Sequence, residues 1–244
     1  IQLLEEDATV PFIARYRKEA TGGLDEVQIR GVSDAAEKYK SLEKRRATIL
    51  RTIEEQGRLD DALRARIDAC MDPKELEDLY LPYKPKRRTR GSKARELGLT
   101  PLALRLLEAY AYGKQRVEAE QFTGDDITSA EEALAGARDI IAELASESAE
   151  VRSRLRSLYA KEAVICSSVV KKKKEEGAKY RDYFEWSERF ASCPAHRYLA
   201  LRRGESEGIL RVSVEPREKE RALQLLRRTF AEELPGLIAR LSQE

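Results

Sequence analysis

Most apolar residues of this 244-residue chain recur at the three- and four-residue spacing of amphipathic helices. The longest such pattern begins at Asp25, and Gly57 follows its last turn, as a glycine commonly does at a helix end. The apolar positions of this segment are Ile29, Val32, Ala36, Tyr39, Leu42, Ile49 and Ile53. The pattern therefore predicts one long helix near the start of the chain.

Shorter helices are predicted from their start signals. In Asp72-Pro-Lys-Glu75 the aspartate can cap a helix, the proline fits the first turn, and the glutamate can bond back to the cap. Ser92, Thr100-Pro101, Ser129 with Glu132, and Ser148 mark four further starts. The expected helices cover about residues 62–69, 73–81, 93–98, 100–113, 130–147 and 149–169, the last of them continuing to Val169 or beyond.

The last quarter of the chain is less uniform. Residues 194–203 fit either a helix closed by Gly204 or a strand, and we favour the helix. Residues 209–214 alternate apolar and polar side chains and are rich in β-branched residues, so they are the best strand candidate. Helix is expected again over 217–230 and 234–241, with a break at Pro235-Gly236.

These elements predict a mainly α fold. Short helices joined by short capped turns indicate an irregular multi-helix bundle with helix-turn-helix elements, and at most a minor β element near 209–214. No internal repeat of fixed period is visible, so a consensus solenoid is not supported. We expect one helical region over 1–115, including a basic loop at 84–93, and a second over 116–244.

Composition agrees with long helices that have solvated outer faces. Hydrophobic residues make up 41% of the chain, and charged residues make up 37%, well above the roughly 25% of typical globular domains. The formal net charge is only +2, so an electrostatic argument depends on local charge. Residues 116–150 hold ten acids and two bases, whereas 151–181 hold ten bases and three acids. Solvated helix faces alone would also produce such runs.

The segment Lys84-Pro-Lys-Arg-Arg-Thr-Arg-Gly-Ser-Lys93 contains six bases and no acid. Guanidinium groups bind phosphate oxygens in a bidentate manner, and Tyr80 and Tyr83 beside the cluster can stack on a base or on an arginine. We predict phosphate-backbone contact, without base-specific reading, through this segment. The alternative is a solvated loop whose tyrosines belong to the core. The predicted contacts are Lys84, Lys86, Arg87, Arg88, Arg90 and Lys93.

A second basic run follows the predicted helix 149–169. Four consecutive lysines on a helix point in all directions, so only some of them can face one partner. A solvated helix end, or attraction to the helix C-terminal dipole, explains the run equally well. As further candidate nucleic-acid contacts we nevertheless take Lys171, Lys172, Lys173 and Lys174.

No catalytic or cofactor site is predicted. The single histidine, His196, lies three residues after Cys193, and a histidine bonded to backbone in a first helical turn explains it more simply than a nucleophile–base pair. No Cys/His spacing suits zinc, and no glycine-rich phosphate loop is present. The three separated cysteines fit reduced thiols in a cytoplasmic protein. No segment is apolar enough to cross a membrane.

Several long motifs follow one another over nearly the whole chain. The first two are Thr9-Val-Pro-Phe-Ile-Ala-Arg-Tyr-Arg-Lys-Glu19 and Thr21-Gly-Gly-Leu-Asp25. The third is Glu77-Asp-Leu-Tyr-Leu-Pro-Tyr-Lys-Pro-Lys-Arg-Arg-Thr89. The later ones are Lys179-Tyr-Arg-Asp-Tyr-Phe184, His196-Arg-Tyr-Leu-Ala200, Arg203-Gly-Glu205 and Glu207-Gly208. In sequence and in order, these motifs resemble the N-terminal region of Tex-type transcription accessory proteins.

The resemblance implies an elongated, mainly helical bacterial protein related to the eukaryotic Spt-family elongation factor. It also implies an RNase-H-like domain, a helix-hairpin-helix pair and a C-terminal OB-type RNA-binding domain further along. We expect this chain to be a piece that begins inside the family's first helices and stops before the RNase-H-like domain. Nucleic-acid binding by the piece alone is then expected to be weak. The family supplies no catalytic residues to carry over.

Two functions follow as hypotheses. The first is a non-catalytic, monomeric helical scaffold of a transcription accessory protein whose basic surface contacts RNA or DNA phosphates without sequence specificity. The second is a protein–protein docking module for polymerase or ribosome-associated machinery, with no nucleic-acid contact of its own. A carboxylate-dependent nuclease is disfavoured because no metal-ligand set is visible.

Overall fold

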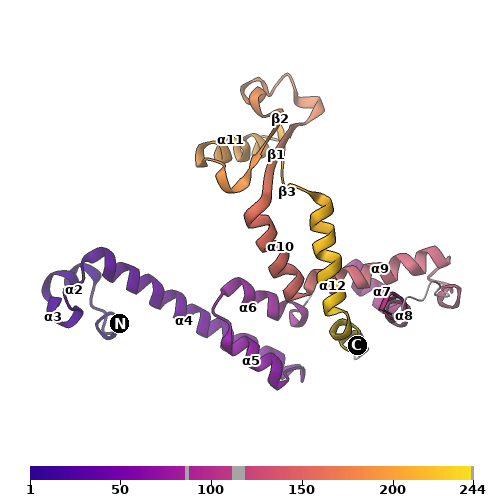
Figure 1. Ribbon diagram of the computed structural model, residues 1–244, viewed down its shortest axis with the longest axis horizontal. Coiled ribbons are helices and arrows are strands. Elements are labelled where there is room, and N and C mark those ends of the chain that lie inside the picture. The colour runs from indigo at the N-terminus through magenta and orange to yellow at the C-terminus, as the bar shows by residue number, and fades with distance from the viewer. Residues whose placement is uncertain (86–87, 112–118, 243–244) are drawn as a thin grey trace. The chain divides into compact units, whose positions relative to one another are not determined.

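A computed structural model of the chain describes residues 1–85, 88–111 and 119–242. It contains two compact units, unit 1 from Ile1 to Lys84 and unit 2 from Pro85 to Glu244 (Figure 1). The predicted boundary between residues 115 and 116 lies outside the described residues and stays a prediction.

Unit 1 is entirely helical. Its longest element is α4 (Glu26–Glu55), which begins at a reciprocal cap: the Asp25 carboxylate accepts from the Gln28 N–H at 2.8 Å, and the Gln28 side chain accepts from the Asp25 N–H at 3.0 Å. The other elements are α1 (Gln2–Glu5), α2 (Val10–Tyr16), α3 (Lys18–Thr21), α5 (Asp61–Ala69), α6 (Pro73–Tyr80) and the 3-10 turn η1 (Leu81–Tyr83).

The core of unit 1 follows one stripe of α4. Ile49 and Ile53 are completely buried, as are Ile67 of α5 and Leu76 of α6. Near its start α4 packs on α2, and further along it packs on α5 and α6. The predicted helix is therefore confirmed, and Ile29, Leu42, Ile49 and Ile53 of its predicted apolar positions are buried. Val32 and Tyr39, also among those positions, are exposed.

Unit 2 combines helices with a small sheet. Its helices are α7 (Arg90–Glu96), α8 (Thr100–Ala111), α9 (Ala130–Glu147), α10 (Ala149–Glu162), α11 (Ala195–Ser206) and α12 (Lys219–Leu241). Its strands are β1 (Ala163–Val169), β2 (Glu185–Arg189) and β3 (Leu210–Pro216). Its 3-10 turns are η2 (Glu120–Phe122), η3 (Lys171–Lys173), η4 (Ala178–Tyr183) and η5 (Phe190–Ser192).

One hydrophobic core of unit 2 lies among α7, α8, α9 and the end of α12. The α12 side chains Leu234, Leu237 and Leu241 are buried there beside Ile140 and Leu144 of α9. We call this part the helical bundle. Burial of these aliphatic side chains contributes about 1.5–3 kcal/mol each and holds the last turns of α12 in place.

The second core belongs to a β-lobe, residues 163–216. Its antiparallel sheet has the order β2-β1-β3. On one face of the sheet Ile165 is completely buried and packs with Leu201 of α11 and with Tyr180, Ile209 and Leu210. On the other face the small polar side chains of Cys166, Ser187 and Ser213 occupy paired positions.

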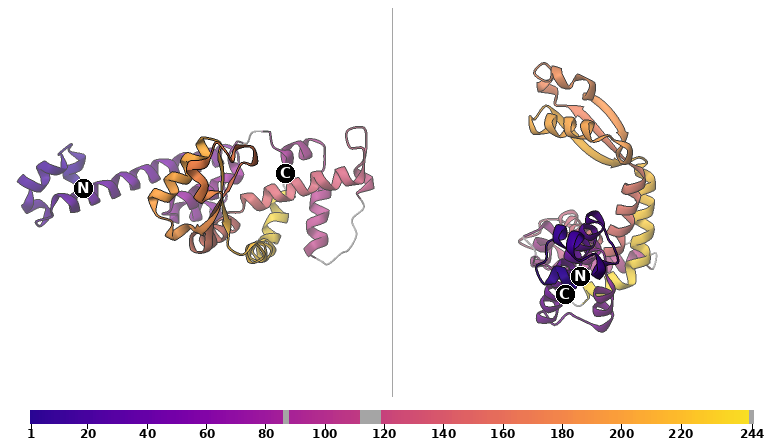
Figure 2. Two further views of the ribbon diagram at one scale, coloured as in Figure 1. Left: turned by 90° about the horizontal axis from the view of Figure 1, so that it is seen from above. Right: turned by 90° about the vertical axis from the view of Figure 1, so that its left-hand side faces the viewer.

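Two helices join the β-lobe to the helical bundle. α10 leads directly into β1, and β3 leads into α12, so the two helices run antiparallel and pack along one another (Figures 1 and 2). Arg154 of α10 links them through its ion pair with Glu232 of α12 at 2.7 Å, and it also pairs with Glu150 of its own helix at 2.6 Å.

The mainly α class is confirmed, and so are most of the predicted helices and the strand near 209–214. The helix predicted to continue to Val169 is wrong, because it ends at Glu162 and residues 163–169 form β1. Ala163, Ile165 and Ser167 are buried with Val164 and Cys166 between them less so, which is the two-residue period of a strand. Strand β2, in which exposed and half-buried positions alternate, was not predicted either.

Two other corrections concern α11 and α12. α11 continues past Gly204, and the turn after it is made by Gly208 at φ 68°. The break predicted at Pro235-Gly236 is absent, since α12 runs continuously to Leu241. The exposed Pro235 lacks one helical hydrogen bond, but buried leucines on the opposite side of the same turns keep the segment helical. The predicted end of α8 near Gly113 lies outside the described residues.

Candidate nucleic-acid interface

The second half of the basic segment is the start of a helix rather than a loop. Thr89 caps α7, with its hydroxyl accepting from the Ser92 N–H at 2.9 Å while the Ser92 hydroxyl accepts from the Thr89 N–H at 2.8 Å. Ser92 was predicted to be the cap, so that prediction is wrong by three residues. Arg90 and Lys93 therefore belong to the first turns of a helix, where their backbone is fixed.

The bases around α7 are exposed. Arg88 pairs with Glu96 at 2.9 Å, and Arg90, whose side chain is 86% exposed, lies 3.6 Å from Asp139 of α9. Lys93 is exposed and makes no ion pair within the described residues. Pairs between exposed side chains contribute only about 0–1 kcal/mol, so a phosphate can compete for these arginines.

α7 is held tightly against α9 beneath these bases. Glu143 of α9 pairs with Arg95 at 2.7 Å, and both side chains are largely buried. The same carboxylate accepts from the Thr89 hydroxyl at 2.5 Å. A β-carbon on Gly91 would lie 2.6 Å from the Glu143 carboxylate and 3.3 Å from the Asp139 carbonyl, so glycine permits this close approach.

The acids of α9 are not simply a solvated face. Asp139, Glu143 and Glu147 follow one another at four-residue spacing, and they face Arg90, Arg95 and Arg240. The basic segment contains no acid of its own, yet the fold supplies acids to it from α9 and from the end of α7. In the sequence, the four-residue spacing of these three acids already indicates that they share one face of a helix.

The other residues of the basic segment have separate positions. Lys84 is exposed at the end of unit 1, and its backbone N–H donates to the Tyr80 carbonyl at 3.1 Å. Lys86 and Arg87 lie outside the described residues. Tyr80 is buried beneath the Arg45 guanidinium, 5.2 Å from the ring centre, and Arg58 lies equally close to Tyr83. Both tyrosines thus stack on arginines of unit 1.

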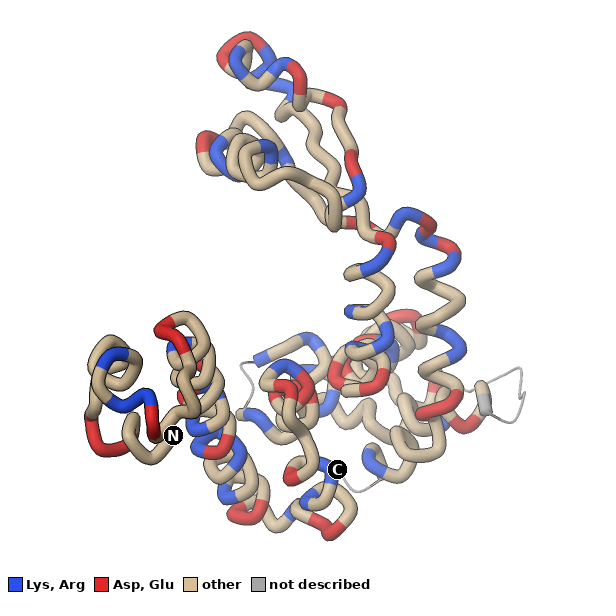
Figure 3. The backbone as a smooth tube through the Cα atoms, turned by 60° about the vertical axis from the view of Figure 1, so that its left-hand side comes forward, with Lys and Arg blue, Asp and Glu red and all other residues tan. Residues whose placement is uncertain are grey.

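The lysine run does not lie at a helix end, because helix α10 has already ended before β1. Lys171, Lys172 and Lys173 form η3 in the connection between β1 and β2, with Lys174 directly after them. Lys171, Lys172 and Lys174 are exposed, while Lys173 pairs with Glu176 at 3.1 Å. A helix dipole therefore cannot explain the run. Figure 3 shows this connection as a cluster of basic and acidic positions at the end of the β-lobe.

No catalytic set is assembled from the described residues. His196 is exposed in the first turn of α11, where the sequence placed it. Burial raises the pKa of the Cys70, Cys166 and Cys193 thiols, which makes each a weaker nucleophile at neutral pH. Within the described ranges, His, Cys, Asp and Glu form no group of three suited to a metal ion. Among those same residues, no helix is both long and apolar enough to span a bilayer.

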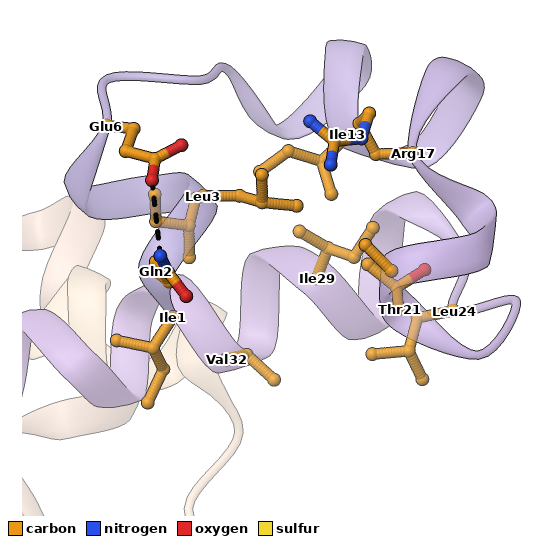
Figure 4. A pocket seen from close by; sticks show the side chains of 12 residues that line it. Ile1, Gln2, Leu3, Glu6, Ile13, Arg17, Thr21, Leu24, Ile29 and Val32 are labelled. Atoms are coloured by element: carbon orange, nitrogen blue, oxygen red, sulfur yellow. Dashed lines mark hydrogen bonds between the residues drawn. The ribbon is translucent and has the colours of Figure 1, made fainter.

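Unit 1 has a pocket of about 300 Å³ between α1, α2, α3 and the start of α4 (Figure 4). Apolar side chains such as Leu3, Ile13 and Ile29 line most of it. Glu6, which accepts from the Gln2 amide at 3.4 Å, and Arg17 are its charged members. The lining lacks a nucleophile with an adjacent base, so it suits an apolar side chain better than a reaction.

Two families match this sequence. Residues 1–54 match the family described as "Tex-like protein N-terminal domain", and residues 113–237 match "Tex central region-like". The second match alone covers half of the chain.

Among curated proteins, the "Transcriptional accessory protein Tex" of Neisseria gonorrhoeae is 49% identical over 216 residues, and "Protein YhgF" of Escherichia coli (strain K12) is 46% identical over 215. Each alignment covers 88% of this chain and 28% of the relative. The human "S1 RNA-binding domain-containing protein 1" is 27% identical over 227 residues, which cover 88% of this chain and 22% of the human protein. The chain thus spans about a quarter of the length of its curated relatives.

Proposed function

This chain belongs to the Tex family, and from that membership we propose that it is a non-catalytic scaffold region of a cytoplasmic, nucleic-acid-binding transcription accessory protein. The names of two relatives support the proposal, since one is a transcriptional accessory protein and another an S1 RNA-binding domain-containing protein. The scaffold uses a basic surface to bind the phosphates of RNA or DNA without reading sequence.

The observation that carries this proposal is the exposure of Arg88, Arg90 and Lys93 on and beside a firmly anchored α7. Because the buried Arg95–Glu143 pair and the Thr89 cap fix the helix, these three side chains start from a fixed backbone. Lys84, at the end of unit 1, and Lys86 and Arg87, which lie outside the described residues, are further proposed phosphate contacts. In the β-lobe the proposed contacts are Lys171, Lys172, Lys173 and Lys174.

The test is the salt dependence of binding. Fluorescence anisotropy of labelled duplex DNA and single-stranded RNA is titrated with the chain at several salt concentrations. Log affinity should fall linearly with log salt, by a slope of about 0.9 for each phosphate neutralised on the duplex. The double variant Arg90→Ala/Lys93→Ala should flatten that slope by roughly one to two units.

The matched control is Arg66→Ala/Lys74→Ala, which removes two exposed bases of unit 1 that have no ion pair in the described residues. Its slope should equal that of the unchanged chain. The proposal is wrong for this chain if neither nucleic acid binds at low salt, or if the α7 variant and the control change the slope equally.

One observation favours protein docking as a second function. Phe12 and Tyr16 of α2 are 46% and 62% exposed with their rings 5.4 Å apart. Exposed apolar side chains gathered in one place are typical of protein interfaces. In this alternative, polymerase or ribosome-associated machinery is the partner, and Phe12→Ser/Tyr16→Ser should abolish its binding without changing nucleic-acid affinity.

A further inference from the structure

A pocket of about 450 Å³ opens in unit 2 where the helix pair meets the sheet. Here α10 passes into β1 and β3 passes into α12, so residues far apart in the sequence come together (Figure 1). Four basic residues line the pocket, each from a different part of this junction: Lys161 at the end of α10, Arg189 at the end of β2, Arg217 between β3 and α12, and Arg221 in α12. The pocket is separate from the α7 surface.

Two of the three acids in the lining already have basic partners. Glu162 pairs with Arg221 at 2.9 Å. Glu188 pairs at 2.7 Å with Arg197 of α11, which is not part of the lining. These carboxylates are therefore neutralised, and they leave the remaining lysine and arginine groups largely uncompensated.

The remaining bases are held differently from one another. Arg189 donates through Nε and Nη2 to the Lys161 carbonyl at 3.2 and 2.7 Å, which orients its guanidinium while a third nitrogen stays available. The Lys161 ammonium and the Arg217 guanidinium have no hydrogen bond or ion pair within the described residues. Besides these three bases, the lining contains one carboxylate, Glu218, that has no ion pair with any described residue.

The first turn of α12 adds to the positive potential. Glu218 occupies the cap position, but its side chain makes no hydrogen bond to the first-turn N–H groups of this 23-residue helix. Those N–H groups and the helix dipole favour an anion at this end. The start of α12 and three basic side chains thus lie around one pocket.

From this arrangement we propose that the junction pocket binds a phosphate group. Guanidinium, ammonium and backbone N–H donors are the groups with which proteins bind phosphate oxygens. The phosphate comes either from a nucleic-acid backbone, in which case the pocket extends the proposed function, or from a free phosphate or pyrophosphate. The β-lobe and the α10–α12 pair both contribute ligands, so the bound anion stiffens their junction.

Isothermal titration calorimetry of the chain with inorganic pyrophosphate tests the site directly. Arg217→Ala and Lys161→Ala should each weaken binding by about tenfold, as expected for one charge-assisted hydrogen bond. The matched control is Arg227→Ala, since Arg227 is also exposed and without an ion pair in the described residues, but lies on α12 outside the pocket. It should bind pyrophosphate as the unchanged chain does. Circular dichroism melting confirms that each variant is folded.

A second measurement identifies the source of the phosphate. If pyrophosphate displaces a labelled single-stranded oligonucleotide and Arg217→Ala weakens the oligonucleotide equally, the backbone is the ligand. If pyrophosphate binds and Arg217→Ala leaves oligonucleotide affinity unchanged, a free phosphate is the ligand. The pocket proposal is overturned if neither ligand binds, or if Arg227→Ala loses as much affinity as Arg217→Ala.

The outcome is independent of the α7 surface. Arg90→Ala/Lys93→Ala should leave pyrophosphate affinity unchanged, because neither residue lines the pocket. If Arg90→Ala/Lys93→Ala leaves the salt slope unchanged while pyrophosphate still binds, the α7 surface of the proposed function is rejected and the pocket is retained.

Discussion

The ion pair between Arg45 and Glu77 ties α4 to α6 in unit 1 through two hydrogen bonds of 2.5 and 3.0 Å. The Arg45 guanidinium lowers the pKa of the Glu77 carboxyl, mainly through this hydrogen bonding. Since the folded pKa lies below the unfolded one, the pair stabilises the fold above the unfolded pKa, and this stabilisation is lost as pH falls through the folded pKa.

Glu77→Gln should therefore lower the free energy of unfolding by at most about 1 kcal/mol at pH 7, because both side chains are partly exposed. The difference should vanish in acid, below the folded pKa. Urea unfolding at a series of pH values measures it. Glu55→Gln is the control, since its pair with Arg51 is long, at 3.8 Å, and fully on the surface. An equal, pH-independent loss in both variants would contradict the assignment.

Gly136 of α9 is a second residue whose identity matters. A β-carbon there would lie 2.4 Å from Leu99 Cδ1, and Leu99 is buried in the helical bundle. Gly136→Ala should lower stability by about 1–3 kcal/mol through overpacking, less the roughly 1 kcal/mol gained in helix propensity. Gly236→Ala in α12, with nothing within 4 Å, should instead raise the melting temperature. Thermal melts of both variants decide whether Leu99, in the connection from α7 to α8, packs this closely on α9.

At the residue scale, local features could be predicted from the sequence, whereas long-range pairings could not. The Asp25 cap, the apolar stripe through Ile49 and Ile53, and the exposure of Arg88 and Lys93 could all be predicted, because each depends on near neighbours in the chain. The pairing of Arg90 with Asp139 could not be predicted, because they lie 49 positions apart and only the packing of α7 on α9 brings them together.

At the scale of elements, the cap of α7 determines where the basic surface begins. Thr89 both caps the helix and donates to Glu143, so Thr89→Ala removes two interactions at once. It should cost about 1–2 kcal/mol of stability and weaken nucleic-acid binding, because Arg90 and Lys93 lose their fixed backbone. Thr89→Ser keeps the hydroxyl and is the control. Chemical unfolding measures the stability of both variants, and fluorescence anisotropy measures their nucleic-acid affinity. If Thr89→Ala is destabilised but binds nucleic acid as the unchanged chain does, the start of α7 does not determine binding.

Elements also show why part of the fold was not predictable. The segment 149–169 begins with a helix start signal but contains no signal for a helix end, since it has no glycine or proline. Only the pairing of β1 with two distant strands makes residues 163–169 extended. The junction pocket escaped prediction for the same reason, because its bases come from the ends of elements that the sequence did not place together.

At the scale of the whole molecule, the chain is organised as two units, with a further division inside unit 2 between the helical bundle and the β-lobe. Trp186, the single tryptophan, lies in β2 with its ring 5.7 Å from that of Tyr183. Its fluorescence consequently reports on the β-lobe alone, whereas circular dichroism is dominated by the helices.

The strands β1 and β3 have one more consequence. Because Ala163 and Pro216 are register partners, the β-lobe begins and ends at neighbouring points, like a cassette inserted into a helical hairpin. Replacing residues 163–216 with a linker of about four residues should leave α10 and α12 as an ordinary antiparallel hairpin. Circular dichroism should show the helical bundle melting cooperatively at a similar temperature, with tryptophan fluorescence and pyrophosphate binding gone. If the shortened chain does not fold, the β-lobe is required for folding of the helical bundle. If it folds, other domains can be inserted between α10 and α12.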